Sequence, residues 1–137
     1  MNQNKAAGAY YEAAFRASAM AHHLHIYDPV GDYLPVDVIV QNNGGKLFRV
    51  QIRGSRFMNK DGVRISLRTG AKKKAYLSCS TYDILAAYAA EYNDWYLIPS
   101  SPLDGLNNVK LYPHVEKSRG QWEKFKENWD IFNASWA

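Results

Sequence analysis

The sequence predicts a mixed α/β fold, and two parts of the chain carry that prediction. Residues 5–24 are rich in alanine and contain no proline, which favours a helix of about five turns. Residues 36–40 and 47–52 each place a row of apolar side chains on one face of a strand. Between them, residues 42–45 (Asn-Asn-Gly-Gly) tolerate positive φ, so the two strands are expected to form a hairpin.

The remaining elements complete an order of helix, three-stranded meander, helix, strand and C-terminal helix. They are expected as strand 63–67, helix 80–92, strand 95–99, edge strand 109–112 and helix 118–132. The helix over 80–92 can begin at a Ser or Thr cap, and its apolar residues follow a helical spacing. The last helix carries four aromatic residues at spacings of three and four, which predicts that this stripe faces the core or a dimer interface.

Length and composition indicate one packed domain over residues 1–137. The chain is 47% hydrophobic and 14% aromatic, which argues for a globular protein and against disorder. Cys79 is the only cysteine, so no intrachain disulfide can form and a reducing compartment is expected. No signal peptide and no membrane-spanning apolar run is recognisable. These features predict a soluble cytoplasmic protein.

Positive charge is concentrated in one segment. Residues 46–74 contain ten basic residues and one acidic residue, a local net charge of +9, whereas the whole chain has a net charge of +4. This asymmetry is typical of a surface that meets a polyanion such as nucleic acid, with a lysine-rich solubilising face as the alternative. The candidate DNA contacts are Arg49, Ser55, Arg56, Arg64, Arg68, Lys72, Lys73 and Lys74.

Polar side chains interrupt one face of the predicted hairpin. Asp37 interrupts the first strand, and Gln51 and Arg53 lie on the polar face of the second, so all three can meet on one side. A carboxylate and an amide carbonyl are oxygen ligands that suit a magnesium-type ion, and the neighbouring cation suits a phosphate. A solvated hairpin face is the alternative, because any half-exposed hairpin shows this alternation.

Glu12 is a candidate for the same site. It lies on the predicted first helix, four residues after Gly8 and four residues before Arg16. An ordinary surface pair with Arg16 is one interpretation. The other is that Glu12 adds a carboxylate to the hairpin site, with Gly8 leaving room for a close approach. The turn-rich loop at residues 28–32 could border this site.

The chain resembles the PD-(D/E)XK nuclease superfamily, especially its homing-endonuclease and Holliday-junction-resolvase-like branches. The resemblance lies in Gly8-x-x-x-Glu12 on a first helix, Asp37 on a strand, and Gln51-Ile52-Arg53-Gly54-Ser55 after a hairpin. The order of elements is similar as well, over about residues 5–99. The resemblance implies a restriction-endonuclease-like core there, with a strand and a helix added over residues 100–137.

The resemblance implies that the catalytic set is Glu12, Asp37, Gln51 and Arg53, and that the first three bind Mg²⁺ or Mn²⁺. Gln51 stands where most members have a carboxylate, a change found in the intron-encoded branch, and its carbonyl still offers an oxygen. Arg53 stands where most members have lysine. Because arginine stays protonated it cannot act as a general base, although it can hold a phosphate.

The implied function is a Mg²⁺-dependent endodeoxyribonuclease that hydrolyses phosphodiester bonds in DNA. A catalytically impaired DNA-binding module of the same fold is the alternative, because Arg53 replaces lysine. A third class is a partner-binding protein that uses the aromatic C-terminal helix. Cutting both strands usually calls for two active sites, so a homodimer or homotetramer is expected.

Overall fold

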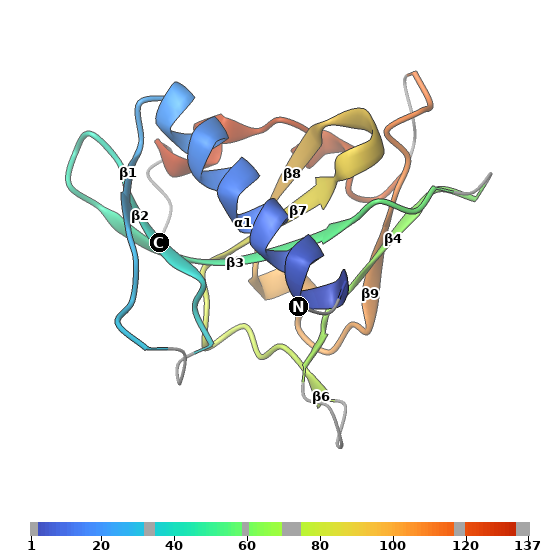
Figure 1. Ribbon diagram of the computed structural model, residues 1–137, viewed down its shortest axis with the longest axis horizontal. Helices are drawn as coiled ribbons and strands as arrows, with labels where there is room; N and C mark the ends of the chain where they lie inside the picture. The colour runs from blue at the N-terminus through green and yellow to red at the C-terminus, as the bar shows by residue number, and fades with distance from the viewer. Residues whose placement is uncertain (1–2, 32–34, 59–60, 70–74, 117–119, 134–137) are drawn as a thin grey trace.

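A five-stranded sheet forms the centre of the computed structural model, which describes residues 3–31, 35–58, 61–69, 75–116 and 120–133 (Figure 1). Its strands, in spatial order, are β1 (His25–Tyr27), β2 (Val38–Gln41), β3 (Leu47–Ser55), β7 (Ile84–Ala89) and β8 (Asp94–Pro99). β3 and β7 are parallel, and the other neighbouring pairs are antiparallel. The mixed α/β class predicted from the sequence is therefore confirmed.

Each face of this sheet is covered by a different layer. Helix α1 (Gln3–Ala21) packs on one face, where Phe15 and Ala19 are fully buried. A two-stranded sheet of β4 (Val63–Ser66) and β9 (Asn108–Leu111) packs on the other face. Alternate residues of β7 enter the two cores, as the two-residue period of a strand requires. The central sheet thus has an α1 side and a β4–β9 side.

Short elements complete the described chain. β5 (Arg68–Thr69) and β6 (Ala75–Tyr76) form a small hairpin. Four 3₁₀ turns are η1 (Ala90–Tyr92), η2 (Ser101–Leu103), η3 (Glu123–Phe125) and η4 (Trp129–Phe132). Within the described ranges, no helix is long and apolar enough to cross a membrane.

The three-stranded meander is present, but it consists of β1, β2 and β3. The sequence pattern predicted residues 63–67 as its third strand. That segment does form a strand, β4, but β4 pairs with β9 in the second sheet. The short β1 was missed because the first helix was extended to residue 24, whereas α1 ends at Ala21.

The helix predicted over residues 80–92 is wrong, because this segment contains the central strand β7. All six residues of β7 are buried, since β3 and β8 flank it and a core lies on each face. A strand buried on both faces has a continuous apolar run without alternation. Its alanine-rich sequence therefore matched a helix as well as a strand.

The C-terminal helix predicted over residues 118–132 is also wrong, because the described part of that segment forms only the turns η3 and η4. Its aromatic residues do not face one side. Trp122 is buried in the core on the β4–β9 side, whereas Trp129 and Phe132 are buried in the core on the α1 side. Glu127 has a φ of 51° and its backbone N–H donates to the Trp95 carbonyl oxygen, which interrupts any helix.

Candidate active site

Asp37 and Gln51 are neighbours where β2 meets β3. The Asp37 backbone N–H donates to the Val50 carbonyl oxygen at 3.0 Å, and the Asp37 Oδ2 atom accepts from the Ile52 N–H at 2.7 Å. These two bonds bracket Gln51, which lies between Val50 and Ile52. Gln51 is only 4% exposed, and its Nε2 atom donates to the Pro35 carbonyl oxygen. Asp37 is therefore held by β3, and Gln51 is held by the segment that leads into β2.

This bonding pattern decides which oxygen atoms can meet a cation. Gln51 uses its amide nitrogen as a donor, so its carbonyl Oε1 atom is the one that could coordinate an ion. Asp37 uses Oδ2 to accept from the backbone, and its Oδ1 atom takes no part in that bond. The two side chains together offer one carboxylate oxygen and one amide oxygen.

Glu12 meets Asp37 from the helix. Both line a pocket of about 290 Å³, together with Arg16, Asp28, Pro29, Gly31 and Val36. Burial raises the pKa of Glu12 above its usual value, and the negative charge of Asp37 raises it further. The loop after β1 borders this pocket, as the sequence analysis expected.

Arg16 does not form an ion pair with Glu12 in the described structure. Its Nη2 atom lies 2.6 Å from Oδ1 of Asp28, and the positive charge of Arg16 only partly offsets the rise in the pKa of Glu12. The surface-pair interpretation of Glu12 therefore finds no support in the geometry. A Cβ atom on Gly8 would meet nothing within 4 Å, so there is open space beside the helix one turn before Glu12.

Arg53 lies two residues beyond Gln51, on the β4–β9 side of the sheet. It is half-buried and is paired in register with Ala87 of β7. Burial raises the pKa of Tyr82 to about 12, and the positive charge of Arg53 opposes part of that rise. Within the described ranges, no ion pair involves Arg53.

Gly54 determines how closely the helix approaches β3. A Cβ atom at this position would lie 2.7 Å from the ring of Tyr11, which is closer than any real contact. Tyr11 precedes Glu12 on α1, so this contact sets the position of the Glu12 backbone relative to the strand that carries Gln51 and Arg53. The motif read from the sequence contains Gly54, but the pattern alone does not reveal its partner.

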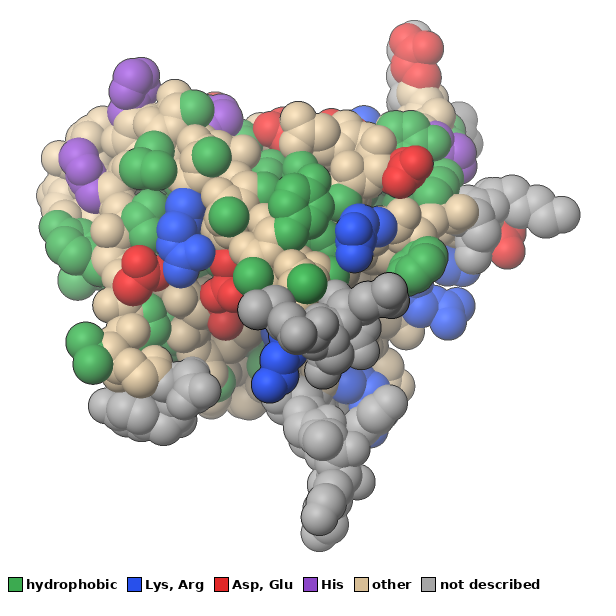
Figure 2. Space-filling view, viewed as in Figure 1, with side chains coloured by type: hydrophobic (Ala, Val, Ile, Leu, Met, Phe, Trp, Pro, Cys, Tyr) green, Lys and Arg blue, Asp and Glu red, His purple; other side chains and the backbone are tan. Residues whose placement is uncertain are grey.

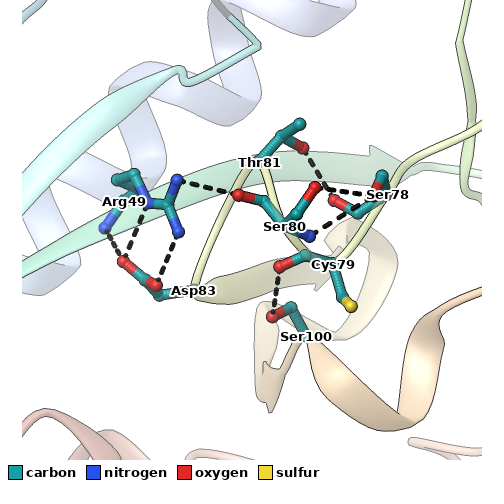
Figure 3. A network of polar contacts seen from close by, with 7 residues as sticks. All are labelled: Arg49, Ser78, Cys79, Ser80, Thr81, Asp83 and Ser100. Carbon is teal, nitrogen blue, oxygen red and sulfur yellow. Dashed lines mark hydrogen bonds and ion pairs between the residues drawn. The ribbon is translucent and has the colours of Figure 1, made fainter.

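Arg49, a predicted DNA contact, is engaged in a polar network at the start of β7 (Figure 3). Its Nε and Nη2 atoms donate to the two carboxylate oxygens of Asp83 at 3.2 and 3.1 Å, and its backbone N–H donates to Oδ2 at 2.7 Å. Its Nη1 atom donates to the Ser80 carbonyl oxygen at 3.0 Å. Burial raises the pKa of Asp83, but the hydrogen bonds from Arg49 outweigh that effect and hold it below its usual value. A contact between Arg49 and DNA would compete with these bonds and stays a prediction.

The other predicted DNA contacts differ in exposure. Three basic side chains are exposed: Arg56, Arg64 and Arg68. Ser55 is half-buried, and its hydroxyl oxygen accepts a hydrogen bond from the Phe57 backbone N–H at 3.1 Å. Lys72, Lys73 and Lys74 lie outside the described residues.

The candidate site contains few of the side chains that most often bind metal ions. Among the residues that the structure describes, no group of three or more His, Cys, Asp or Glu could hold a metal ion. The candidate set contains only two carboxylates, Asp37 and Glu12, because an amide takes the third position. An amide oxygen from Gln51 would supply the third ligand.

Two carboxylates, Glu12 from a helix and Asp37 from a hairpin, thus share one pocket in this α/β fold. The chain matches the model of the PD-(D/E)XK endonuclease family over residues 1–129, and it belongs to that family. Among solved structures it is similar to a bacterial homing endonuclease, I-Ssp6803I, with a TM-score of 0.81 and 18% identity over 96% of this chain and 95% of that chain. No curated protein matches the chain in sequence. The family resemblance and the restriction-endonuclease-like fold are thus confirmed.

Proposed function

We propose that the chain is a metal-dependent DNA endonuclease that hydrolyses phosphodiester bonds. The observation that carries this proposal is the position of Asp37, which is bonded to both chain neighbours of Gln51 and shares a pocket with Glu12. Asp37 thereby links the strand that carries Gln51 to the helix that carries Glu12. Membership of an endonuclease family supports the same conclusion.

The chemistry of these side chains fits a small divalent ion. All the donors are oxygen atoms, which suit Mg²⁺ or Mn²⁺ better than softer metals. Burial and the charge of Asp37 both disfavour the ionised form of Glu12, and a nearby cation would relieve that repulsion. Asp37, Glu12 and the Gln51 Oε1 atom would hold the ion. When bound, such an ion neutralises phosphate charge and lowers the pKa of a bound water molecule.

Arg53 is assigned to the scissile phosphate. Its guanidinium group has no ion pair within the described ranges, and it can donate two parallel hydrogen bonds to phosphate oxygens. These bonds would orient the phosphate and stabilise the charge that develops on it during attack. Because arginine stays protonated, Arg53 does not accept the proton of the attacking water molecule.

A DNA-binding module that has lost cleavage is the second candidate. The residue in the lysine position favours it, because Arg53 cannot supply any function that requires a neutral amine. The two candidates share the fold and the DNA surface, and they differ only in whether phosphodiester bonds are cut.

A cleavage assay tests the proposal directly. Supercoiled plasmid and a labelled four-way DNA junction are incubated with the protein and Mg²⁺, Mn²⁺ or a chelator. We expect nicked or linear products with either metal and none with the chelator. Binding without any product, at all metal concentrations, would support the DNA-binding module instead. The two substrates also show whether intact duplex or branched DNA is cut.

Two copies of the chain would be needed to cut both strands. Each copy offers one such site, and strands of opposite polarity are most simply cut by two sites related by twofold symmetry. A homodimer or a homotetramer is therefore part of the proposal. Sedimentation velocity with and without duplex DNA measures the oligomeric state.

A further inference from the structure

The sheet formed by β4 and β9, called the ribbon below, separates its side chains sharply by face. Its inward residues are all buried in the core on that side of the molecule: Val63, Ile65, Val109 and Leu111. Its outward residues are all polar or basic: Arg64, Ser66, Asn108 and Lys110. The inward residues fix the ribbon to the molecule. They do not explain the choice of residues on the outer face.

Two basic residues of the outer face lie directly opposite each other. The register pairs Arg64 with Lys110 and Ser66 with Asn108. Like charges at facing positions destabilise an antiparallel pair. Within the described ranges, no ion pair with an acidic residue compensates either Arg64 or Lys110. An anion placed over this pair would offset their repulsion.

The remaining side chains of this face indicate which anion fits. Arginine and lysine donate to the O6 and N7 atoms of guanine, asparagine forms paired bonds with adenine, and serine bonds to either base. All three kinds of side chain stand on the outer face of the ribbon, in two facing pairs. Serine and asparagine can also donate to phosphate oxygens, so the test below distinguishes base contacts from phosphate contacts.

The dimensions of the ribbon suit the major groove. Two strands lie about 4.8 Å apart, and the major groove of B-DNA is about 12 Å wide and admits a two-stranded ribbon. The Arg64 and Lys110 pair is two residues from the Ser66 and Asn108 pair. That separation is about 6.7 Å along the strand, close to two base-pair steps of about 3.4 Å.

The ribbon also lies on the appropriate side of the molecule. It packs on the face of the central sheet to which Arg53 points, and β3 contacts β4. Figure 2 shows Lys and Arg side chains at several places on the visible face, including the right-hand edge, where Figure 1 places β4. The ribbon and Arg53, the residue assigned to the scissile phosphate, thus lie on the same side of the central sheet.

We propose that the outer face of the ribbon reads base edges in the major groove of duplex DNA, with Arg64, Lys110 and Asn108 as specificity-determining residues. This inference rests on the proposed function and adds the surface that recognises the base sequence of the DNA. It assigns base recognition to residues of two strands that are far apart in the chain. Lys110 and Asn108 lie outside the basic segment that the sequence singled out.

A selection experiment tests this inference. Wild-type protein is mixed with a pool of duplex oligonucleotides that carry a randomised central segment, with Ca²⁺ in place of Mg²⁺, and the bound DNA is sequenced. We expect Asn108→Ala to lose its preference at one position by about 10-fold, the cost of one paired base contact. Arg64→Lys keeps the charge but loses the planar fork, so it should weaken the preference for guanine at one position with little loss of total affinity.

Control variants and modified bases identify the surface. Lys46→Ala removes a positive charge from the turn before β3, at the opposite end of that strand from β4, and should select the wild-type sequence. In the selected site, 7-deazaguanine or 7-deazaadenine removes a major-groove acceptor and should weaken binding of wild-type protein. If Asn108→Ala and Arg64→Lys select the wild-type sequence and only bind more weakly, or if the deaza bases have no effect, the inference is wrong.

The outcomes separate this inference from the proposed function. A wild-type protein that cleaves DNA but enriches no sequence would overturn base reading by the ribbon and leave the nuclease intact. A wild-type protein that neither binds nor cleaves DNA would overturn the proposed function. Lys110→Thr provides an independent measurement without DNA, because removal of the like-charge pair should raise the melting temperature. An unchanged or lower melting temperature would contradict the repulsion on which the inference depends.

Discussion

The Asp37 carboxylate accepts a 2.7 Å hydrogen bond from the backbone N–H of Ile52. The same aspartate donates its own backbone N–H to Val50. One residue thus joins β3 on both sides of Gln51, just before β2 begins. Asp37 consequently has a structural role in addition to its proposed role as a metal ligand, and the two roles can be separated by substitution.

Asp37→Asn and Asp37→Ala should both reduce cleavage by at least about 100-fold, because removing a ligand costs more than removing its supporting contacts. Only the alanine variant should also lose about 1–2 kcal/mol of unfolding free energy, since it leaves the Ile52 N–H without an acceptor. Single-turnover cleavage and urea unfolding measure the two effects. Wild-type cleavage by the asparagine variant would remove Asp37 from the metal site.

Glu12→Gln should change how stability depends on pH. The folded protein raises the pKa of Glu12 above 4.5, so its contribution to stability is present below that pH and is lost as the pH rises through the folded-state pKa. Without metal, the glutamine variant should therefore melt at a higher temperature than wild type at pH 8, and the difference should vanish near pH 4.

The same two proteins test metal binding. Mg²⁺ should raise the melting temperature of wild-type protein at pH 8, because it binds the folded state. Mg²⁺ should raise the melting temperature of Glu12→Gln much less, since one carboxylate ligand is missing. An equal response in both proteins would exclude Glu12 as a ligand, whatever its pKa.

Asp83→Ala should lower the unfolding free energy by about 1–2 kcal/mol, because it leaves the Arg49 backbone N–H and guanidinium group without their acceptor. This range takes into account that both side chains are partly exposed. The pKa of Asp83 is lowered from 3.8, so its contribution is present above that pH and is lost as the pH falls through the folded-state value. Urea unfolding at pH 7 and pH 3 should show a smaller difference at pH 3 than at pH 7.

A double-mutant cycle decides the role of Arg49. If Arg49 is structural, Arg49→Ala and Asp83→Ala should be far from additive in stability. Arg49→Ala should then leave the salt dependence of DNA binding unchanged. If the logarithmic salt slope falls by about 1, Arg49 contacts a phosphate and the DNA-contact prediction stands.

Local sequence patterns predicted the parts of the fold that depend on residues close together in the sequence. The hairpin of β2 and β3 was predicted because alternation and the Asn-Gly turn both act over a few residues. The strand β7 was not predicted, because its burial on both faces depends on β3 and β8. An apolar run alone is equally compatible with a helix. The aromatic residues of the C-terminal segment enter two different cores, which no helical period describes.

At the candidate site, too, contacts set by local patterns were predicted and contacts between distant residues were not. The proximity of Asp37 and Gln51 follows from hairpin register. Glu12 was one of two open interpretations of the helix pattern, and the family resemblance favoured its place in the site. The pairing of Arg49 with Asp83 and the contact of Gly54 with Tyr11 join residues that are distant in sequence. Charge alone assigned Arg49 to DNA, because a sequence pattern does not show which acidic residue lies beside a basic one.

Arg53→Lys tests whether the departure from the family pattern is a working variant or a loss of function. If Arg53 holds the scissile phosphate, lysine keeps the charge but loses the planar fork, so the cleavage rate should fall by no more than about 10-fold. Arg53→Ala removes the charge as well and should lower the rate by about 100- to 1000-fold. We expect arginine to be a working variant, because Asp37 and Gln51 keep a geometry that a site without function would not need. Single-turnover cleavage rates at saturating Mg²⁺ are measured for wild type and both variants.

A lysine variant that gains cleavage over an inactive wild type would show that arginine abolished the activity and would favour the DNA-binding module. Equal rates in the three proteins would mean that Arg53 takes no part in the reaction.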